Sequence, residues 1–212
     1  MVTVRSRMII MPRSRCSACL RPASHCLCAT ISPVCSDTHV VVLQHADESN
    51  HALNTGRLAA MGLVNGRLLI GERFDQFSAV WHDYQPYLLF PGNDATDITT
   101  LPPPPDGRPR MLIVPDATWR KARKLLYLNP VLQDLPRVTL PAGLSSRYYL
   151  RKAPMPDALS TIEAITHALE YLETPRCFQA LLRPFEALMA TQIEAMGADT
   201  FQRNYASRIQ ST

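Results

Sequence analysis

Short apolar runs alternate with stretches of helical spacing along most of the chain. The runs of strand length cover residues 39–45, 67–71, 87–90, 111–114 and 137–140. Apolar residues recur at helical spacing over residues 54–61, 118–128, 158–172 and 177–196. Continuous apolar strands separated by helices are typical of a mostly parallel sheet covered on both faces. The pattern therefore predicts an α/β fold in which helices flank the sheet.

The composition indicates a chain that folds and does not cross a membrane. Of its 212 residues, 46% are hydrophobic, which excludes wholesale disorder. Its apolar runs are much shorter than the ~18 residues that a membrane helix needs, and no secretory signal precedes them. We therefore expect a cytoplasmic protein in two parts: a basic arm with a cysteine element over residues 1–36, and an α/β domain over residues 37–212.

The charge is distributed unevenly. The formal total is only +4, from 22 basic and 18 acidic residues. Yet residues 108–152 hold ten basic side chains against Asp116 and Asp134, and five arginines precede the first acid, Asp37. Two basic segments in an otherwise acidic chain are typical of a protein that binds a polyanion, most often a nucleic acid. No two glycines are spaced as Gly-x-Gly, so neither a dinucleotide fingerprint nor a P-loop is present.

Four cysteines stand close together near the N-terminus: Cys16, Cys19, Cys26 and Cys28. Two closely spaced pairs bring four sulfur ligands to one point at little entropic cost, which suits tetrahedral zinc. Disulfides are the alternative, but without an export signal we expect a reducing compartment and favour structural zinc. His25, beside Cys26, is an alternative ligand.

Polar clusters fall at three predicted strand ends or helix starts. In open α/β sheets, ligands bind outside the carboxyl ends of strands. These candidates are Gln44, His45, Asn54, Thr55, Gly56 and Arg57, then Asp116, Thr118 and Trp119, and finally Ser160, Thr161 and Glu163. Each cluster also has an ordinary interpretation: helix caps at the first two, a core position for Trp119, and a capping box at Ser160-x-x-Glu163.

Basic residues, some interleaved with aromatic ones, form the candidate RNA-binding surface. Arginine and lysine contact phosphates, and tyrosine can stack on bases. A solvated basic helix face is the ordinary alternative for those near Trp119. The candidates are Arg15 and Arg21, then Arg120, Lys121, Arg123 and Lys124, and finally Arg147, Tyr148, Tyr149, Arg151 and Lys152.

Taken in order, these motifs resemble the DTW-domain family of tRNA-uridine aminocarboxypropyltransferases. The motifs that carry the resemblance span residues 15–170: the four cysteines, Leu43-Gln44-His45, Asn54-Thr55-Gly56-Arg57-Leu58-Ala59, Asp116-Ala117-Thr118-Trp119, Tyr148-x-Leu150-Arg151-Lys152 and Ser160-Thr161-Ile162-Glu163-Ala164. The family is named for Asp-Thr-Trp, and here Ala117 stands between the aspartate and the threonine. The resemblance also implies a SPOUT-like sheet with a trefoil knot.

The resemblance implies a reaction. The 3-amino-3-carboxypropyl group of S-adenosylmethionine would move to N3 of a loop uridine in tRNA, releasing methylthioadenosine. Because N3 carries a proton, a positioned carboxylate is the natural general base, and we expect Asp116 in that role. The other strand-end candidates would bind the donor, and Thr161 and Glu163 would hold its carboxylate and ammonium groups. No obligate protein partner is evident.

Two other functions fit part of the pattern. An RNA methyltransferase would use the same donor and release S-adenosylhomocysteine instead. A non-catalytic zinc-containing RNA-binding protein would explain the cysteines and basic segments, but would leave Asp116 and the donor-binding motifs without a role.

Overall fold

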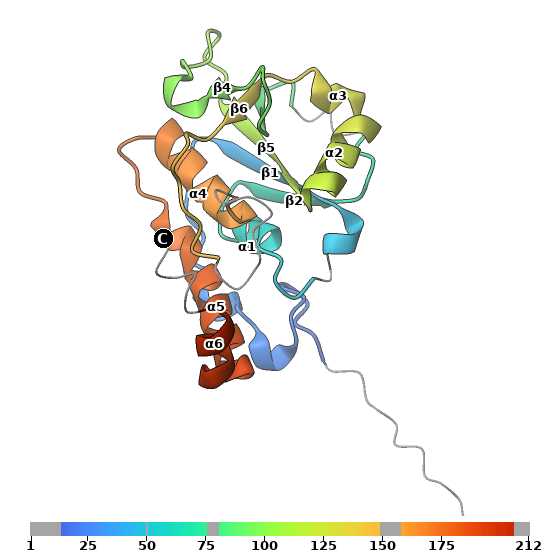
Figure 1. Cartoon of the computed structure of the whole chain (residues 1–212). Helices are drawn as coiled ribbons and strands as arrows, with labels where there is room; N and C mark the ends of the chain where they lie inside the picture. The colour runs from blue at the N-terminus through green and yellow to red at the C-terminus, as the bar shows by residue number, and fades with distance from the viewer. Residues whose placement is uncertain (1–13, 50, 76–80, 149–157, 206–212) are drawn as a thin grey trace, which may run out of the picture.

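The computed structural model describes residues 14–49, 51–75, 81–148 and 158–205, and its centre is a six-stranded sheet (Figure 1). The strands are β1 (His39–Gln44), β2 (Gly66–Ile70), β3 (Gln85–Leu89), β4 (Thr96–Asp97), β5 (Arg110–Asp116) and β6 (Arg137–Thr139). Their order is β2-β1-β5-β3-β6-β4, and every neighbouring pair is parallel. The predicted α/β architecture with a mostly parallel sheet is confirmed.

Helices cover both faces of this sheet. They are α1 (Gly56–Met61), α2 (Trp119–Leu128), α3 (Pro130–Gln133), α4 (Thr161–Leu172), α5 (Arg183–Met196) and α6 (Ala198–Asn204). In β5, Leu112 and Val114 pack with α1, α4 and α5, whereas Met111 and Ile113 pack with α2 and α3. Since successive strand residues point to opposite faces, the central strands must be apolar at almost every position.

The register of the central strands brings two polar side chains together. In the parallel pair β1–β5, Gln44 lies opposite Asp116 at the carboxyl ends of both strands. Just before them, Leu43 and Ile113 are fully buried. Burying such a side chain contributes about 1.5–3 kcal/mol to the stability of the fold. The packed core therefore fixes the positions of the two polar residues that follow it.

Five predicted strands and four predicted helical segments are present, with shifted ends. The segment expected to be helical over residues 177–196 is divided into a 3-10 helix, Gln179–Leu182, and α5, with Pro184 in the first turn of α5. Proline lacks an N–H and is therefore tolerated only at a helix start. The short elements β4, α3 and α6 were not predicted. Among the described residues, no helix is long and apolar enough to cross a membrane.

The cysteine element packs against the α/β part of the chain. It contains two short 3-10 helices, Ala23–His25 and Cys28–Thr30. Between them, Leu27 is 4% exposed and belongs to the hydrophobic core that includes Leu58 and Leu188. In Figure 1 this blue segment lies beside α5, below the sheet. A domain boundary at residues 36 and 37 remains a prediction.

Candidate functional site

The Asp116 carboxylate is the centre of a buried hydrogen-bond network at the end of β5. The residue is only 5% exposed. Its Oδ2 accepts hydrogen bonds from Gln44 Nε2 at 2.8 Å and Asn54 Nδ2 at 2.7 Å, and its Oδ1 accepts one from Thr161 Oγ1 at 2.6 Å. The structure therefore joins all three predicted polar clusters at one carboxylate: Gln44 and Asn54 of the first cluster and Thr161 of the third donate to Asp116 of the second.

Asn54 and Gly56 shape the loop that passes this carboxylate. Asn54 Oδ1 accepts from Gln44 Nε2 at 2.9 Å and from the backbone N–H of Arg57 at 3.2 Å. Thr55 occupies the N-cap position of α1 without a side-chain capping bond, so the Asn54 side chain performs that task. A Cβ atom on Gly56 would overlap the Asp116 carboxylate, which explains why glycine stands there.

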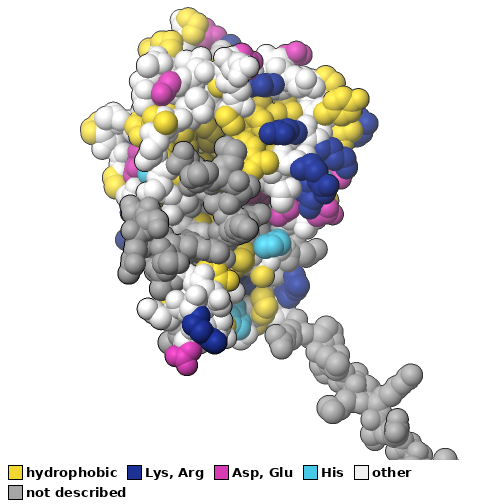
Figure 2. Space-filling view, viewed as in Figure 1, with side chains coloured by type: hydrophobic (Ala, Val, Ile, Leu, Met, Phe, Trp, Pro, Cys, Tyr) yellow, Lys and Arg dark blue, Asp and Glu magenta, His cyan; other side chains and the backbone are white. Residues whose placement is uncertain are grey.

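An apolar cavity of about 310 Å³ opens beside this network. It lies where β3, β5 and β6 end and α4 begins, and two predicted donor-binding residues line it, Trp119 and Thr161. The Trp119 and Phe90 rings lie 5.5 Å apart at a tilt of 56°. Figure 2 shows hydrophobic side chains gathered around a hollow on this face. Trp119 therefore lines a cavity, which supports the stacking interpretation over a core position.

Several residues of the cavity wall were not predicted from the sequence. Most of them come from the ends of strands and from irregular loops, where the sequence has no regular period, and Ala164 lies in α4. They are Leu89, Phe90, Pro91, Val138, Thr139, Leu140, Pro141, Ala142, Leu144, Ala158, Leu159 and Ala164. Thr118 stands at the N-cap position of α2, as the cap interpretation predicts, but it is exposed and its side chain makes no capping hydrogen bond.

Glu163 forms the predicted capping box with Ser160 and also binds the segment that contains Ser146 and Arg147. Its carboxylate accepts from the Ser160 backbone N–H at 2.8 Å, while the Ser160 hydroxyl caps α4. The same carboxylate accepts from Ser146 Oγ at 2.8 Å and the Arg147 backbone N–H at 2.7 Å. Glu163 is 2% exposed, so these donors already surround the group expected to hold the donor's ammonium.

His45 lies away from the Asp116 network, although it follows Gln44. It is 3% exposed, and its Nδ1 accepts from the Asp47 backbone N–H at 3.2 Å. Its Nε2 lies 2.9 Å from Glu72 Oε1, but the alignment is poor for a hydrogen bond. The structure thus places the His45 side chain next to Asp47 and Glu72, the acids that pair with the lysines of α2.

Two of the predicted RNA-binding lysines are paired with acids. Lys121 Nζ lies 3.1 Å from Asp47 Oδ2 and 3.2 Å from Glu48 Oε1, and Lys124 Nζ lies 2.8 Å from Glu72 Oε2. The hydrogen bond from Lys121 to Asp47 raises the pKa of the lysine. These ion pairs reduce the positive charge that α2 offers to a polyanion.

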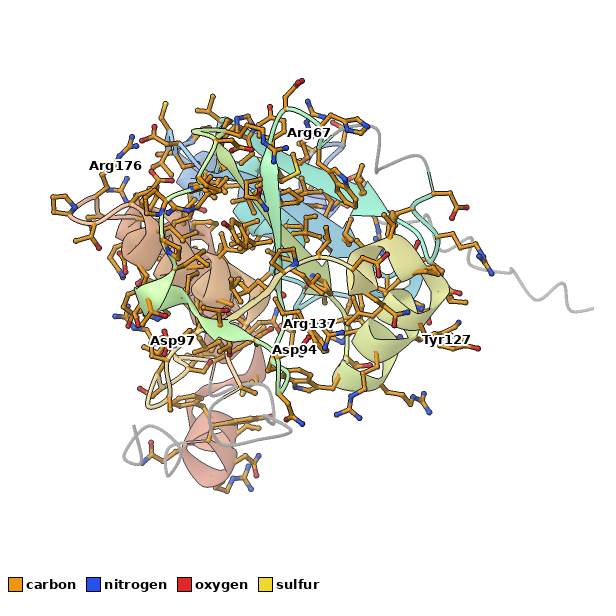
Figure 3. All side chains as sticks on the ribbon, turned by 90° about the horizontal axis from the view of Figure 1, so that it is seen from above. Arg67, Asp94, Asp97, Tyr127, Arg137 and Arg176 are labelled. Carbon is orange, nitrogen blue, oxygen red and sulfur yellow. The ribbon has the colours of Figure 1, made fainter. Side chains whose placement is uncertain are left out.

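The outer face of α2 retains two arginines. Arg120 and Arg123 are exposed, and neither has an ion-pair or hydrogen-bond partner among the described residues. Tyr127, one turn further along and 79% exposed, projects from α2 into solvent (Figure 3). Lysine and arginine side chains gather over α2 at the right of Figure 2, beside the hydrophobic hollow.

Arg21 and Tyr148 hold the loop before α1 from two sides. Arg21 donates to the carbonyls of Ala52 at 2.6 Å and Asn54 at 3.1 Å, and the Tyr148 hydroxyl donates to the Leu53 carbonyl at 2.7 Å. Both were predicted to contact RNA, and in the structure both side chains instead hold the backbone of the loop that precedes α1. Arg15 donates to the Leu20 carbonyl, and Arg147 lies 3.4 Å from Glu186. Tyr149, Arg151 and Lys152 lie outside the described residues.

The four N-terminal cysteines form a cluster that could hold a metal ion. Their sulfur atoms all lie within 4.8 Å of one another, and none forms a disulfide. Cys16 and Cys28 are 3.6 Å apart and Cys19 and Cys26 are 3.8 Å apart. A tetrahedron of sulfurs about 2.3 Å from zinc has edges of about 3.8 Å, so the spacing fits. His25 is outside the cluster, with Nδ1 2.8 Å from Ser24 Oγ.

The cysteine thiols differ in acidity. Backbone N–H groups of Cys19 and Ala18 lower the pKa of Cys16 to about 6. Burial raises the pKa of Cys28 to about 12. A bound cation would stabilise all four thiolates, since metal binding displaces their protons.

With this geometry established, comparison identifies the family. The chain belongs to the DTW-domain family, whose DTW domain matches residues 13–193. It is 31% identical over 206 residues to mouse (Mus musculus) tRNA-uridine aminocarboxypropyltransferase 2, covering 92% of this chain and 69% of the relative. The Macaca fascicularis protein of the same name is 32% identical, covering 86% of this chain and 64% of the relative. The Drosophila melanogaster one is 29% identical, covering 86% and 76%. No solved structure matches.

Proposed function

We propose that this protein is a tRNA-uridine aminocarboxypropyltransferase. It transfers the 3-amino-3-carboxypropyl group of S-adenosylmethionine to N3 of an unpaired uridine and releases methylthioadenosine. Its DTW-domain membership and its similarity to proteins of that name support this reaction. The structural observation that carries the proposal is the hydrogen bond from Thr161, a residue of the cavity wall, to the buried Asp116 carboxylate.

The apolar cavity is the proposed donor site. Ligands of parallel α/β sheets bind at the carboxyl ends of strands, and β3, β5 and β6 end at this cavity. Trp119 and Phe90 supply aromatic surface for an adenine ring. S-adenosylmethionine supplies an electrophilic carbon attached to a sulfonium that can leave as a neutral thioether. We also propose a SPOUT-like trefoil knot around this cavity, in line with the all-parallel sheet.

Asp116 is the proposed general base. The N3 proton must leave before the N3 electron pair can attack carbon, and a carboxylate can accept it. Asp116 does not line the cavity, whereas Thr161 does and donates to Asp116 Oδ1. The Thr161 hydroxyl can therefore take the N3 proton while passing its own to Asp116. The C–S bond breaks as the N3–C bond forms, and its electron pair stays on sulfur.

The tRNA is the proposed partner, and it must present its uridine unpaired because N3 lies on the pairing edge. Arg120 and Arg123 border the cavity residue Trp119 on α2 and are available for phosphates. Zinc in the cysteine cluster would be structural and would hold Arg21 against the loop that carries Asn54. We propose the cytoplasm as the place of this reaction.

A direct test uses purified protein, unmodified tRNA and S-adenosylmethionine labelled in its aminocarboxypropyl arm. Nucleoside mass analysis should show the labelled arm on uridine, with methylthioadenosine as the co-product. A methylated nucleoside with S-adenosylhomocysteine would identify a methyltransferase instead. If tRNA binds but S-adenosylmethionine gives no saturable heat in calorimetry, the protein is a non-catalytic RNA-binding protein.

A further inference from the structure

A second cavity, of about 230 Å³, lies between the cysteine element and the loop that precedes α1. Its wall carries five basic side chains: Arg15, Arg21, His25, His51 and Arg57. Gln192 of α5 completes the wall, and among the described residues no aspartate or glutamate lines it. A cavity with several cationic groups and no carboxylate is suited to an anion.

Among the three arginines of this wall, Arg57 is the one whose guanidinium is available for an added ligand. Arg21 is committed to the Ala52 and Asn54 carbonyls, and Arg15 donates to the Leu20 carbonyl. The Arg57 guanidinium is half-buried and has no ion-pair or hydrogen-bond partner among the described residues. Cys19 also lines the cavity, and Arg21 interacts electrostatically with its thiol.

We propose that this cavity holds a backbone phosphate of the tRNA substrate, with Arg57 as its main contact. The inference rests on the proposed function and extends it to a second contact point with RNA. A guanidinium presents a fork of N–H donors that matches two phosphate oxygens. The cavity lies close to the proposed general base, because Asn54 lines the cavity and donates a hydrogen bond to Asp116 at 2.7 Å. A phosphate held here fixes one nucleotide at a set distance from the proposed base.

A phosphate fits the wall better than the amino-acid end of the donor does. The donor's ammonium is best held by an anionic acceptor, whereas the part of this wall that the structure describes has three arginines and no carboxylate. Phosphate contacts fix the register of a nucleic acid without reading its bases. This site therefore positions the tRNA, and the apolar cavity, which Thr161 links to Asp116, receives the donor.

The test compares Arg57→Ala, Arg57→Lys and wild type in tRNA binding at several salt concentrations. Arg67→Ala is the matched control. Arg67, labelled in Figure 3, is an exposed arginine on β2 and lines neither of the two cavities. We expect Arg57→Ala to raise the tRNA dissociation constant about 10-fold and to reduce the slope of log affinity against log salt by about one. Arg57→Lys should retain most of the affinity, and Arg67→Ala should change it less than twofold.

Calorimetry with S-adenosylmethionine and with inorganic phosphate separates the alternatives. Unchanged donor affinity in Arg57→Ala supports the proposal, whereas lost donor affinity with unchanged tRNA binding would make Arg57 a donor ligand and overturn it. If inorganic phosphate binds wild type alone while tRNA affinity is equal in both, the cavity is a site for small anions and the proposal is wrong. A wild-type enzyme that binds tRNA without modifying it would refute the proposed function but not this phosphate site.

Discussion

The Thr161 hydroxyl donates a 2.6 Å hydrogen bond to Asp116 Oδ1, joining the first residue of α4 to the last residue of β5. Thr161 lines the apolar cavity, and Asn54, which donates to the other carboxylate oxygen, lines the cationic one. The carboxylate is therefore one hydrogen bond from each cavity. An enzyme that joins two substrates needs its proton acceptor between them, and this arrangement provides one.

Asp116→Asn should abolish most turnover while preserving the fold. The amide oxygen can still accept from Gln44 and Asn54, and the amide nitrogen can donate to Thr161, so the network survives without a base. Since general-base catalysis contributes about 10²–10⁴ in rate, we expect single-turnover rates to fall at least 100-fold. Calorimetry should show unchanged donor binding, and gel shift unchanged tRNA binding. Near-wild-type turnover would leave Asp116 as an anchor of the loop and not a base.

Thr161→Val should reduce turnover, whereas Thr161→Ser should not. Valine keeps the shape of threonine but removes the hydroxyl through which the cavity reaches Asp116. We expect kcat to fall about 10²-fold in Thr161→Val, with the melting temperature lowered by the unpaired carboxylate oxygen. Serine restores the hydroxyl, so its kcat should return to within a few-fold of wild type. Equal rates for valine and serine would show that the proton does not pass through this residue.

The sequence predicted the sheet and the polar centre better than it predicted the cavities. Val40, Val42 and Leu43 lie in an apolar run that is buried on both faces, so the strand was evident. β4 has only two residues, which is too short for any period to show. The three side chains that donate to Asp116 were singled out in two separate motifs, but their convergence depends on contacts between residues 45, 62 and 72 positions apart. The cavity residues Phe90 and Leu144 come from irregular loops.

Gly56→Ala should disturb the site although it adds only a methyl group. That group would overlap the Asp116 carboxylate, so either the loop or the carboxylate must move. Overpacking of this kind costs about 1–3 kcal/mol of stability, and a displacement of about 1 Å can lower the rate 10²-fold. Gly71→Ala is the control, because its nearest neighbour would lie 3.6 Å away. Thermal unfolding and kcat measurements on both variants check this, and similar effects in both would contradict it.

Removing the metal should loosen the cysteine element and then the site. We expect one zinc ion for each chain by elemental analysis, and a lower melting temperature in chelator-treated protein. Cys19→Ser should abolish zinc binding, because Cys19 is a buried member of the cluster. Cys35→Ser and Cys177→Ser are the controls, since both residues are exposed and outside the cluster. A purified protein that folds with no bound metal would overturn the assignment.

The two arginines of α2 should contribute more to tRNA affinity than its two lysines. Lys121 and Lys124 already face carboxylates, and these ion pairs hold the lysines away from direct contact with a phosphate. Arg120 and Arg123 have no such partner among the described residues, and each can release counterions from the RNA. We expect Arg120→Ala and Arg123→Ala each to weaken tRNA binding about 3- to 10-fold and to flatten its salt dependence. Lys124→Ala, on the same exposed face, is the matched control. If Lys124→Ala weakens binding as strongly as Arg123→Ala, the prediction is wrong. The Lys124–Glu72 ion pair must then open when RNA binds, so that the lysines and arginines of α2 contact the RNA together.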